Sequence, residues 1–450
     1  MTERFLEHTR GAQAALNCFI EVQEELAMGE AQRIDEQLER GAEVGLLGGV
    51  PYAAKDIFVH NGRLPSNGSR NVRLVTHARF SPALDRLSAA GAVGLGWLNL
   101  DPFSYTTTGT NPEFGSVRNP WDPARMTGGS SSGPAAAVAF GAVPFAVGGD
   151  TGGSVRIPAA YCGVVGLKPT FGRVPRRGAS RLSYSQDALG ILARSVHDVS
   201  LALEVLAGHD PLDPASMNVA VPSYLASLAD GRDGLRSVRI GVDEAYTAAN
   251  CGAEVQTATT RALGTMEAHG AELVAVDLSC LDDYDVVASV LTWSEASAIH
   301  SRTFPINRDD YGSATRARLN AALLSHGADH VNALRLQGRA LKEFLRDVLA
   351  HVDLVAHATT PGPPALLRDV EREARVGIVT GSLASLQMNR PFSLLGLPAM
   401  SLPIGFDSTD LPIGLQLVGR PWAESTLLRC GAAYQAITDW HLRVPPVAAT

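Results

Sequence analysis

Two turns rich in glycine and serine lie close together in the chain and could assemble a site for acyl transfer. They span Gly128–Gly133 and Gly148–Ser154, and a run of Ala, Val and Phe joins them. No charged residue occurs between Arg125 and Asp150. Glycine lets a backbone adopt positive φ and approach another group closely. Two such turns can bring serine hydroxyls and backbone N–H groups to one point, as nucleophilic attack on a carbonyl requires.

A lysine inside an apolar segment is a second candidate for chemistry. Lysine and arginine together number 38, yet only Lys55, Lys168 and Lys342 are lysines. Lys55 lies within the segment GGVPYAAKDIFV. A lysine that is removed from water can lose its proton and act as a base, whereas an arginine keeps its charge. Lys55 is therefore a candidate general base.

The residues Gly129–Gly133 also match G-x-S-x-G, the nucleophile elbow of α/β-hydrolases. In that interpretation Ser131 is the nucleophile, and a histidine further along the chain is the base. The elbow should directly follow a β-strand, but the segment NPWDP precedes it, and no HGG-type loop lies upstream. This alternative is disfavoured on those two grounds. The candidate histidines are His300, His326 and His357.

Phosphate-binding and metal-binding patterns are weak in this chain. No Gly-Lys-Ser/Thr ending and no G-x-G-x-x-G after a strand is found, and the 12 histidines include no H-E-x-x-H. His326 and His330 have i, i+4 spacing beside Asp329, and two histidines on one helical face can bind zinc. Such a pair without a glutamate base is more typical of a solvated helix end. We therefore expect no metal and no cofactor.

The composition is that of an ordinary globular chain, with 450 residues, 45% hydrophobic and 19% charged. The net charge of −8 argues against a nucleic-acid surface. Its five cysteines are scattered without a C-x-x-C pair, so neither a zinc ribbon nor a disulfide framework is indicated. The polar start MTERFLEHTR has no signal-peptide core, and the uncharged run around Pro144 is too short to span a bilayer. We expect a cytoplasmic monomer or homodimer that binds neither nucleic acid nor membrane.

Hydrophobic periodicity places secondary structure around the candidate residues. Residues 3–42 carry a helical rhythm, and residues 48–59 predict a short β segment that holds Lys55. A helix is expected over 135–140, after Pro134, and a buried strand over 145–147. Strand and helix alternate over 238–276, which predicts parallel strands covered by helices. Further helices are expected over 83–90, 196–206, 331–349 and 424–436, and strands over 92–98, 164–174, 353–358, 398–403 and 414–418.

Several segments resemble the motifs of the amidase signature family, in the same order. GGSSSGPAAAVAFG and GGDTGGSVRIPAAYCGVVGLKPTFGRV correspond to its central signature, together with VPYAAKDIF, NPWDPARMTGG, SVHDVSLALEVLAGHDPLDP, FSLLGLPAMSLPIG and LPIGLQLVGRPW. The resemblance implies an α/β fold with a large mixed, twisted central β-sheet and helices on both faces. We expect a single domain over residues 1–450. It would comprise a catalytic core over about 45–210, a variable substrate-shaping region over about 210–340, and a C-terminal return over about 350–436.

The resemblance also implies a catalytic triad of Lys55, Ser130 and Ser154. In the family, the residue at Ser154 is the nucleophile, the one at Ser130 lies on a cis peptide bond and relays a proton, and the one at Lys55 is the base. Burial of Lys55 among apolar neighbours favours its neutral form. The oxyanion hole implied by the resemblance consists of the backbone N–H groups of Thr151, Gly152, Gly153 and Ser154.

Other matched positions are expected to support the triad. Asp150 and Arg156 flank the nucleophile turn and are expected to pin it, while Ser131 and Ser132 are expected to form hydrogen bonds around the triad. Lys168 is expected to be a structural ion-pair partner rather than a base.

The substrate is the least defined feature. The family acts on small, fatty and aryl amides, on ureas such as carboxybiuret and allophanate, and on carbamates. Two segments look most like the branch that includes carboxybiuret hydrolase, namely GLKPTFGRVPRRG and GHDPLDP. Two loops that border the substrate in relatives depart from the family pattern, at Asp101–Phe103 and Gly109–Gly115. The predicted pocket is mostly apolar and aromatic, so we expect an uncharged amide or carbamate, aryl-bearing or not. Its candidate residues are Met126, Gly128, Tyr105, Phe114, Tyr184 and Gln387, with Thr107, Trp293 and Phe392 as further candidates.

A function of another class is also open. The family includes the amidase subunit of the glutamine-dependent transamidosome, which works with partner subunits and charged tRNA. The acidic balance and the compact amino terminus disfavour this alternative. A catalytically inactive binding protein is disfavoured as well, because all three triad positions are occupied.

Overall fold

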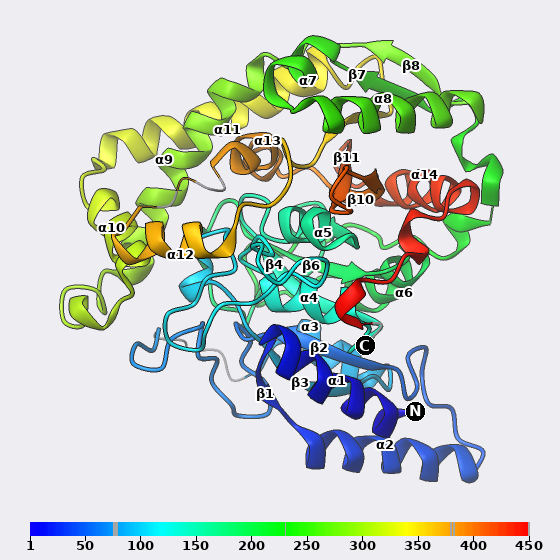
Figure 1. The fold of residues 1–450 in the computed structure, drawn as a ribbon, viewed down its shortest axis with the longest axis vertical. Coiled ribbons are helices and arrows are strands. Elements are labelled where there is room, and N and C mark those ends of the chain that lie inside the picture. The colour runs from blue at the N-terminus through cyan, green and yellow to red at the C-terminus, as the bar shows by residue number, and fades with distance from the viewer. Residues whose placement is uncertain (75–79, 230, 379, 381–382, 449–450) are drawn as a thin grey trace.

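The computed structural model describes residues 1–74, 80–229, 231–378, 380 and 383–448. In this part of the chain, 11 strands form one sheet with the order β1-β3-β2-β4-β6-β5-β10-β11-β9-β7-β8 (Figure 1). The strands are β1 (Phe19–Val22), β2 (Pro51–Lys55), β3 (Val93–Leu98), β4 (Phe145–Asp150), β5 (Val165–Lys168), β6 (Ala188–Ala193), β7 (Arg239–Val242), β8 (Glu272–Ala275), β9 (Leu354–Ala358), β10 (Ala399–Phe406) and β11 (Pro412–Gly419).

The sheet is mixed. Strand β2 is parallel to its neighbours β3 and β4, and β7 is parallel to β8 and β9. The parallel strands predicted over 238–276 are thereby confirmed. Strand β6 runs antiparallel between β4 and β5, and β10 runs antiparallel to β5 and β11. The predicted α/β class with a large mixed central sheet is confirmed.

The helices begin and end where local signals place them. Ser195 caps α6, because its hydroxyl accepts the N–H of Asp198. Helix α4 begins at Ser132, three residues before the predicted start, and holds Pro134 in its first turn, where proline is tolerated. The helices are α1 (Thr2–Leu16), α2 (Glu24–Glu39), α3 (Pro82–Ala89), α4 (Ser132–Phe140), α5 (Arg156–Cys162), α6 (Val196–Leu206), α7 (Glu244–Asn250), α8 (Ala253–Ala268), α9 (Cys280–His300), α10 (Ser313–Ala322), α11 (Gly327–Asp347), α12 (Leu367–Arg375), α13 (Leu383–Leu394) and α14 (Glu424–Ile437).

Helices cover both faces of the sheet, as successive residues of β4 show. Phe145 and Val147 belong to a core that also contains side chains of α6 and α14. Ala146 belongs to a second core, which contains side chains of α1 and α4. Because successive side chains of a strand point to opposite faces, these two cores lie on opposite sides of the sheet.

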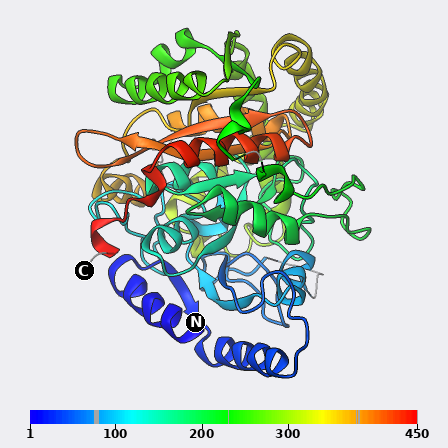
Figure 2. The ribbon, with the colours of Figure 1, turned by 90° about the vertical axis from the view of Figure 1, so that its right-hand side faces the viewer.

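Helices from distant parts of the sequence pack together beside the sheet. Helix α9 packs against α11 and α13, and α10 packs against α9 and α12, along the left of Figure 1. Figure 2 shows α1 and α2 at the end of the molecule opposite to α7, α8 and β8. The region over 210–340 therefore contacts the C-terminal return through α9 and α10.

The structure corrects two sequence-based expectations. The helical rhythm over 3–42 is interrupted by β1, because Asn17 adopts a left-handed conformation with φ of 56° at the end of α1. Strand β1 then pairs with β3, and an edge strand of four residues leaves little alternation to detect. Strand β6 is not predicted by the pattern either, because all six of its residues are buried and show no polar alternation.

Candidate active site

Lys55 ends strand β2, whose five residues are all buried. Its side chain has no solvent-exposed surface, and its Nζ donates a hydrogen bond of 2.7 Å to Oγ of Ser130. Burial lowers the pKa of Lys55 to about 7, although the carboxylates of Asp101, Asp150 and Asp187 act in the opposite direction. The amine therefore gains or loses its proton near neutral pH.

Ser130 lies in the loop before α4, where the Gly129–Ser130 peptide bond is cis. The carboxylate of Asp101 supports this loop so closely that a Cβ at position 129 would lie 2.1 Å from Asp101 Oδ1. The hydroxyls of Thr106 and Thr108, and the N–H groups of Thr108 and Gly109, bind that carboxylate. The family resemblance predicts that Asp101 lies in a loop that borders the substrate. The structure shows that Asp101 also packs against the Ser130 loop.

A backbone hydrogen bond joins the two glycine- and serine-rich turns. The N–H of Ser131 donates to the carbonyl oxygen of Ser154 over 3.0 Å. Ser154 lies between β4 and α5, and only 3% of its surface is exposed. Ser130 and Ser154 therefore lie in adjoining turns at the carboxyl ends of neighbouring parallel strands, β2 and β4.

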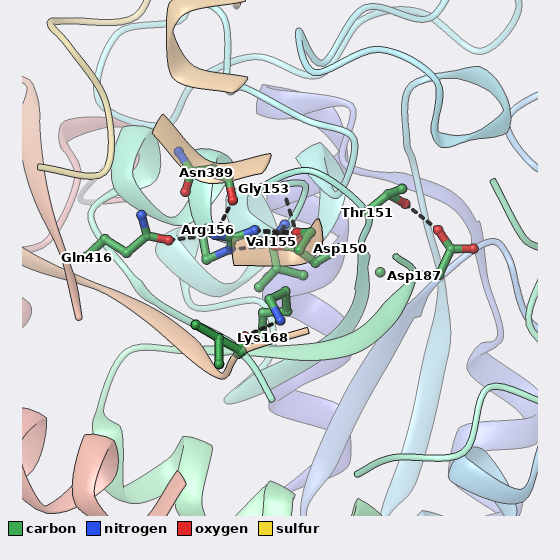
Figure 3. A network of polar contacts seen from close by, with 12 residues as sticks. Asp150, Thr151, Gly153, Val155, Arg156, Lys168, Asp187, Asn389 and Gln416 are labelled. Carbon is green, nitrogen blue, oxygen red and sulfur yellow. Dashed lines mark hydrogen bonds and ion pairs between the residues drawn. The ribbon is translucent and has the colours of Figure 1, made fainter. Parts of the chain in front are cut away.

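Asp150 holds the turn that carries Ser154 through bonds to Gly153 and Val155, which are labelled in Figure 3. Its carboxylate accepts the N–H of Gly153 over 2.8 Å and the N–H of Val155 over 3.1 Å. Gly153 has φ of 113°, which only glycine adopts readily, and a Cβ there would lie 2.6 Å from Cβ of Asn389. Carboxylate bonding on one side and close packing on the other thus determine the shape of this turn.

Arg156 neutralises Asp150 inside the protein (Figure 3). Its Nε and Nη2 donate to the Asp150 carboxylate over 3.0 and 2.8 Å, and its Nη1 donates to Asn389 and Gln416. Both members of the ion pair have side chains without exposed surface. Burial alone would raise the pKa of Asp150, but the Arg156 guanidinium holds that pKa well below its usual range. These contacts agree with the predicted role of the pair in pinning the turn.

Lys168, the last residue of β5, lies buried near the same ion pair. Its Nζ donates to the backbone carbonyls of Leu397 and of Pro169. Burial, and after it the charge of Arg156, lowers the pKa of Lys168 to about 7. The expected ion pair is not found within the described residues, because carbonyl oxygens rather than a carboxylate surround the amine.

Thr151 connects the nucleophile turn to a second buried carboxylate. Its hydroxyl donates to Asp187 over 2.6 Å (Figure 3). The N–H groups of Leu182 and Ser183 bind the same carboxylate. Burial raises the pKa of Asp187, against the attraction of Arg176. Sequence reasoning missed Asp187, because it lies in SYSQDALG, a segment that none of the recognised motifs covers.

Two of the predicted substrate contacts lie against α5. Met126 is buried in a cluster with Ile157 and Tyr161. Gly128 has φ of 71°, and a Cβ there would lie 2.9 Å from the Tyr161 ring. Both residues lie shortly before Ser130 in the chain. They therefore contribute to the packing of the Ser130 loop against α5.

The other predicted substrate contacts lie in separate places. Tyr105 is buried, and among the described residues its hydroxyl has no hydrogen-bond partner. The guanidinium carbon of Arg70 lies 4.2 Å from the centre of the Phe114 ring. Phe392 is a core residue rather than a pocket wall, because it has no exposed surface and stacks against His357. Of the remainder, Thr107 is buried, and Tyr184, Trp293 and Gln387 are exposed.

Two cavities border the loop over 101–116. One of about 20 Å³ borders the nucleophile turn at Thr151 and is also lined by Arg176 and Asp187. The other, of about 430 Å³, lies between this loop, the start of α10 and the end of α12. Of these two, only the smaller cavity contacts the turn that carries Ser154.

The hydrolase-elbow alternative receives no support from the contacts of Ser131. Its hydroxyl donates to the Gly149 carbonyl over 3.1 Å and accepts the Gly149 N–H. Across the described residues no histidine forms a hydrogen bond with the Ser131 hydroxyl. The three candidate histidines have other partners, and His300 bonds to Tyr311. His357 bonds to Gln416, and His326 caps helix α11 together with Asp329.

Two further kinds of feature are not found in the described ranges. No group of three or more His, Cys, Asp or Glu residues there could hold a metal ion. No helix there is both long and apolar enough to cross a membrane.

Comparison with known proteins identifies the family. A family model described as Amidase matches residues 1–428. A glutamyl-tRNA(Gln) amidotransferase subunit from Synechococcus sp. (strain JA-3-3Ab) is 35% identical over 470 residues, which cover 99% of this chain and 90% of that protein. A chain from a vestigial protein complex, described as revealing the origins of an s-triazine catabolic enzyme, superposes with a TM-score of 0.87 at 33% identity, over 97% of this chain and 94% of that one.

A bacterial aryl acylamidase of the amidase signature family also has the same fold. It superposes with a TM-score of 0.87 at 25% identity, over 100% of this chain and 94% of that chain. The family match and these likenesses extend over nearly the whole length of the sequence. The chain therefore belongs to the amidase signature family and is an enzyme that acts on amide-type C–N bonds.

Proposed function

We propose that the protein hydrolyses linear amide-type C–N bonds with Ser154 as nucleophile, Ser130 as proton relay and Lys55 as base. The observation that carries this proposal is the 2.7 Å hydrogen bond between Lys55 Nζ and Ser130 Oγ, both without exposed surface. Because the pKa of Lys55 is lowered to about 7, much of the amine is uncharged at neutral pH. An uncharged amine can accept the Ser130 proton.

The proposed reaction proceeds in two halves. Ser130 passes its proton to Lys55 and takes the proton of Ser154, whose Oγ forms a bond to the acyl carbon. The protonated Lys55 then returns a proton through Ser130 to the departing amine as the C–N bond breaks, which leaves an acyl-enzyme. Water attacks the ester while its proton passes through Ser130 to Lys55. The relay then returns this proton to Ser154 Oγ as the ester C–O bond breaks, which releases the acid and restores Ser154 and neutral Lys55.

The hydrogen bonds of the turn reduce the number of candidate donors for the proposed oxyanion hole. Of the four predicted donors, the N–H of Gly153 is already bound to Asp150. The N–H groups of Thr151, Gly152 and Ser154 have no acceptor within the described part of the chain. We assign oxyanion stabilisation to these three amides, which can donate to the negative oxygen of the tetrahedral intermediate.

Labelling with a fluorophosphonate tests the assignment of the nucleophile. We expect mass spectrometry of the labelled protein to find the adduct on Ser154, because this reagent reacts with activated serines. The label should be lost in a Lys55→Ala variant and kept in a Ser131→Ala variant. An adduct on Ser131 would overturn the proposal in favour of the nucleophile-elbow alternative.

A turnover assay with a panel of substrates can determine which class of C–N bond the enzyme cleaves. Linear amides, aryl amides and carbamates are all compatible with a serine nucleophile, and the likeness to an aryl acylamidase supports inclusion of anilides. A turnover assay should compare short amides, anilides, carbamates and carboxybiuret. Activity confined to carboxybiuret would show that the enzyme hydrolyses urea derivatives, and it would contradict a urethane hydrolase.

A second candidate function has one specific observation in its favour. The Synechococcus relative, which is 35% identical over 99% of this chain, belongs to a glutamyl-tRNA(Gln) amidotransferase. In that case the protein would release ammonia from glutamine while bound to partner proteins. Glutaminase activity that depends on a co-purified partner would favour this function, whereas full amidase activity of the purified chain would count against it.

A further inference from the structure

Strand β6 places a carboxylate opposite the first residue of the nucleophile turn. Asp150, the last residue of β4, pairs with Ala188, the first residue of β6, in an antiparallel register. The next pair in this register is Thr151 and Asp187, beyond the end of the backbone ladder. Side chains at directly opposite positions lie close enough to interact, and the Thr151 hydroxyl donates to Asp187 over 2.6 Å (Figure 3). A hydrogen bond between side chains therefore joins β6 to the turn at the point where the strands separate.

Packing leaves room beside the first residue of this turn. A cavity of about 20 Å³ is lined by Thr151 and Asp187, among others, and this is enough for one water molecule. Close packing therefore does not fix the Thr151 side chain on this side, whereas the hydrogen bond to Asp187 does. Because a β-branched side chain has few χ1 positions, a fixed hydroxyl also restricts the backbone that carries it.

The backbone of Thr151 matters because its N–H is free. Within the described part of the chain this N–H has no acceptor, and it is one of the three amides assigned above to the oxyanion. A donor stabilises an oxyanion only when it is held in the direction of the developing charge. A misplacement of about 1 Å can slow a reaction roughly 10²-fold. A group that orients Thr151 can therefore change the rate without contacting the substrate.

Helix α9 fixes the loop that precedes β6. Glu295 accepts the hydroxyls of Ser183 and Ser185. The side-chain amide of Gln186 donates to a backbone carbonyl of α9 and to the Thr292 hydroxyl, both over 3.0 Å. The carboxylate that follows Gln186 in the chain is therefore held in position by α9.

We propose that Asp187 is a positioning residue, which through the Thr151 hydroxyl holds the Thr151 N–H toward the oxyanion of the tetrahedral intermediate. This deepens the proposed function and rests on it, because the oxyanion belongs to the acyl group that Ser154 attacks. Asp187 acts through Thr151 rather than on the substrate. Helix α9, which lies in the region predicted to shape the substrate site, thereby supports the catalytic turn.

The rate of fluorophosphonate labelling measures this role whatever the substrate is. Ser154 Oγ bonds to phosphorus, fluoride departs, and the Ser154 proton passes to the relay. The phosphonyl oxygen gains negative charge during this attack, so it needs the same donors as an acyl oxyanion. We expect Thr151→Val, which removes the hydroxyl and keeps the N–H, to slow labelling at least about tenfold. Asp187→Asn should slow labelling as well, whereas Thr151→Ser, which keeps the hydroxyl, should retain most of the rate.

The pH dependence of labelling separates this role from general damage to the fold. Burial lowers the pKa of Lys55, whereas three carboxylates raise it, those of Asp101 on the loop after β3, Asp150 at the end of β4, and Asp187. Arg176 is the cation that acts on Asp187 itself. Loss of the Asp187 charge therefore lowers the pKa of Lys55 further, so the rise of the labelling rate should move to lower pH in Asp187→Asn. Thr151→Val keeps this charge and should keep the rise near pH 7.

A similar pair on the surface provides the matched control. In the turn between β10 and β11, Asp407 accepts the Thr409 hydroxyl over 2.8 Å, together with the N–H groups of Thr409 and Leu411. Thr409→Val removes the same kind of bond from an exposed turn, so it should leave the labelling rate unchanged.

A double variant tests whether the two residues act through one bond. Thr151→Val with Asp187→Asn should label no more than about twofold more slowly than the slower single variant, because both changes remove the same interaction. The comparison belongs at about pH 9, above the lowered pKa of Lys55, where its amine is uncharged in each protein.

The outcomes separate this proposal from the proposed function. Unchanged labelling of Thr151→Val, an equal loss in Thr151→Ser, or a double variant slowed by the product of the single effects would overturn the role of Asp187. If circular dichroism shows that Asp187→Asn does not fold, the comparison of Thr151→Val with Thr151→Ser decides. An adduct at a residue other than Ser154 in the unsubstituted protein would instead overturn the serine mechanism.

Discussion

Replacing Lys55 with methionine is expected to lower kcat/KM by about 10³-fold, within the range by which a positioned base accelerates a reaction. Methionine has a similar length and no proton acceptor of comparable basicity, so Ser130 would lose its partner at 2.7 Å. The protein should remain folded, because a fully buried amine is replaced by an apolar group in an apolar strand. Steady-state hydrolysis and circular dichroism of both proteins provide the measurement.

The pH dependence gives the same experiment a sharper readout. Because burial lowers the pKa of Lys55 to about 7, kcat/KM should rise with pH through about 7 and then level off. The residual activity of the methionine variant should not show this rise. If the variant retained both its rate and its pH profile, Lys55 would not be the base.

Stability should also report on this lysine. Between about pH 7 and 10.5 the unfolded chain holds a proton that the folded Lys55 has lost, so the free energy of unfolding rises with pH in this window. Lys168, whose pKa is also lowered to about 7, contributes a rise of the same sign. Urea unfolding at several pH values should therefore show a shallower rise for Lys55→Met than for the unsubstituted protein.

Removing the Asp150 carboxylate is expected to cause the largest loss of stability, about 3–5 kcal/mol in the free energy of unfolding. Asp150→Ala would leave Arg156 as a buried charge without its counter-ion, and would orphan the N–H groups of Gly153 and Val155. Since these bonds shape the turn that carries Ser154, labelling of that serine should fall as well. Urea unfolding and fluorophosphonate labelling together measure both effects.

A matched control comes from an exposed ion pair. Asp347 pairs with Arg346 at the end of α11, where both side chains are more than half exposed. Asp347→Ala should therefore leave stability and labelling unchanged, because exposed pairs are screened by water. An equal, small effect of the two substitutions would show that Asp150 does not determine the shape of the turn.

Sequence reasoning succeeded where the signal was local. The helix over 196–206 was predicted with the bounds of α6. A β segment around Lys55 was predicted too, although over 48–59 rather than Pro51–Lys55. The family and the overall fold could also be predicted, because the motifs lie in continuous stretches of chain. The roles of Lys55, Ser130 and Ser154 stay predictions, and they came from the resemblance rather than from spacing.

The groups that support the site were missed where the signal was not local. Asp187 reaches Thr151 from 36 positions away in the sequence, and no spacing rule connects them. Gly153 shows the opposite kind of error, a residue assigned a role that its contacts do not favour. Its N–H was predicted to bind the oxyanion, but it is already bound to Asp150.

The scarcity of lysine has a practical consequence for chemical modification. Two of the three lysines, Lys55 and Lys168, lie inside the protein with 0% and 1% of their surfaces exposed. Lys342, on α11, is exposed. An activated ester should therefore acylate one lysine side chain of the folded enzyme besides the α-amino group. A dye or a solid support can then be attached to a single defined side chain.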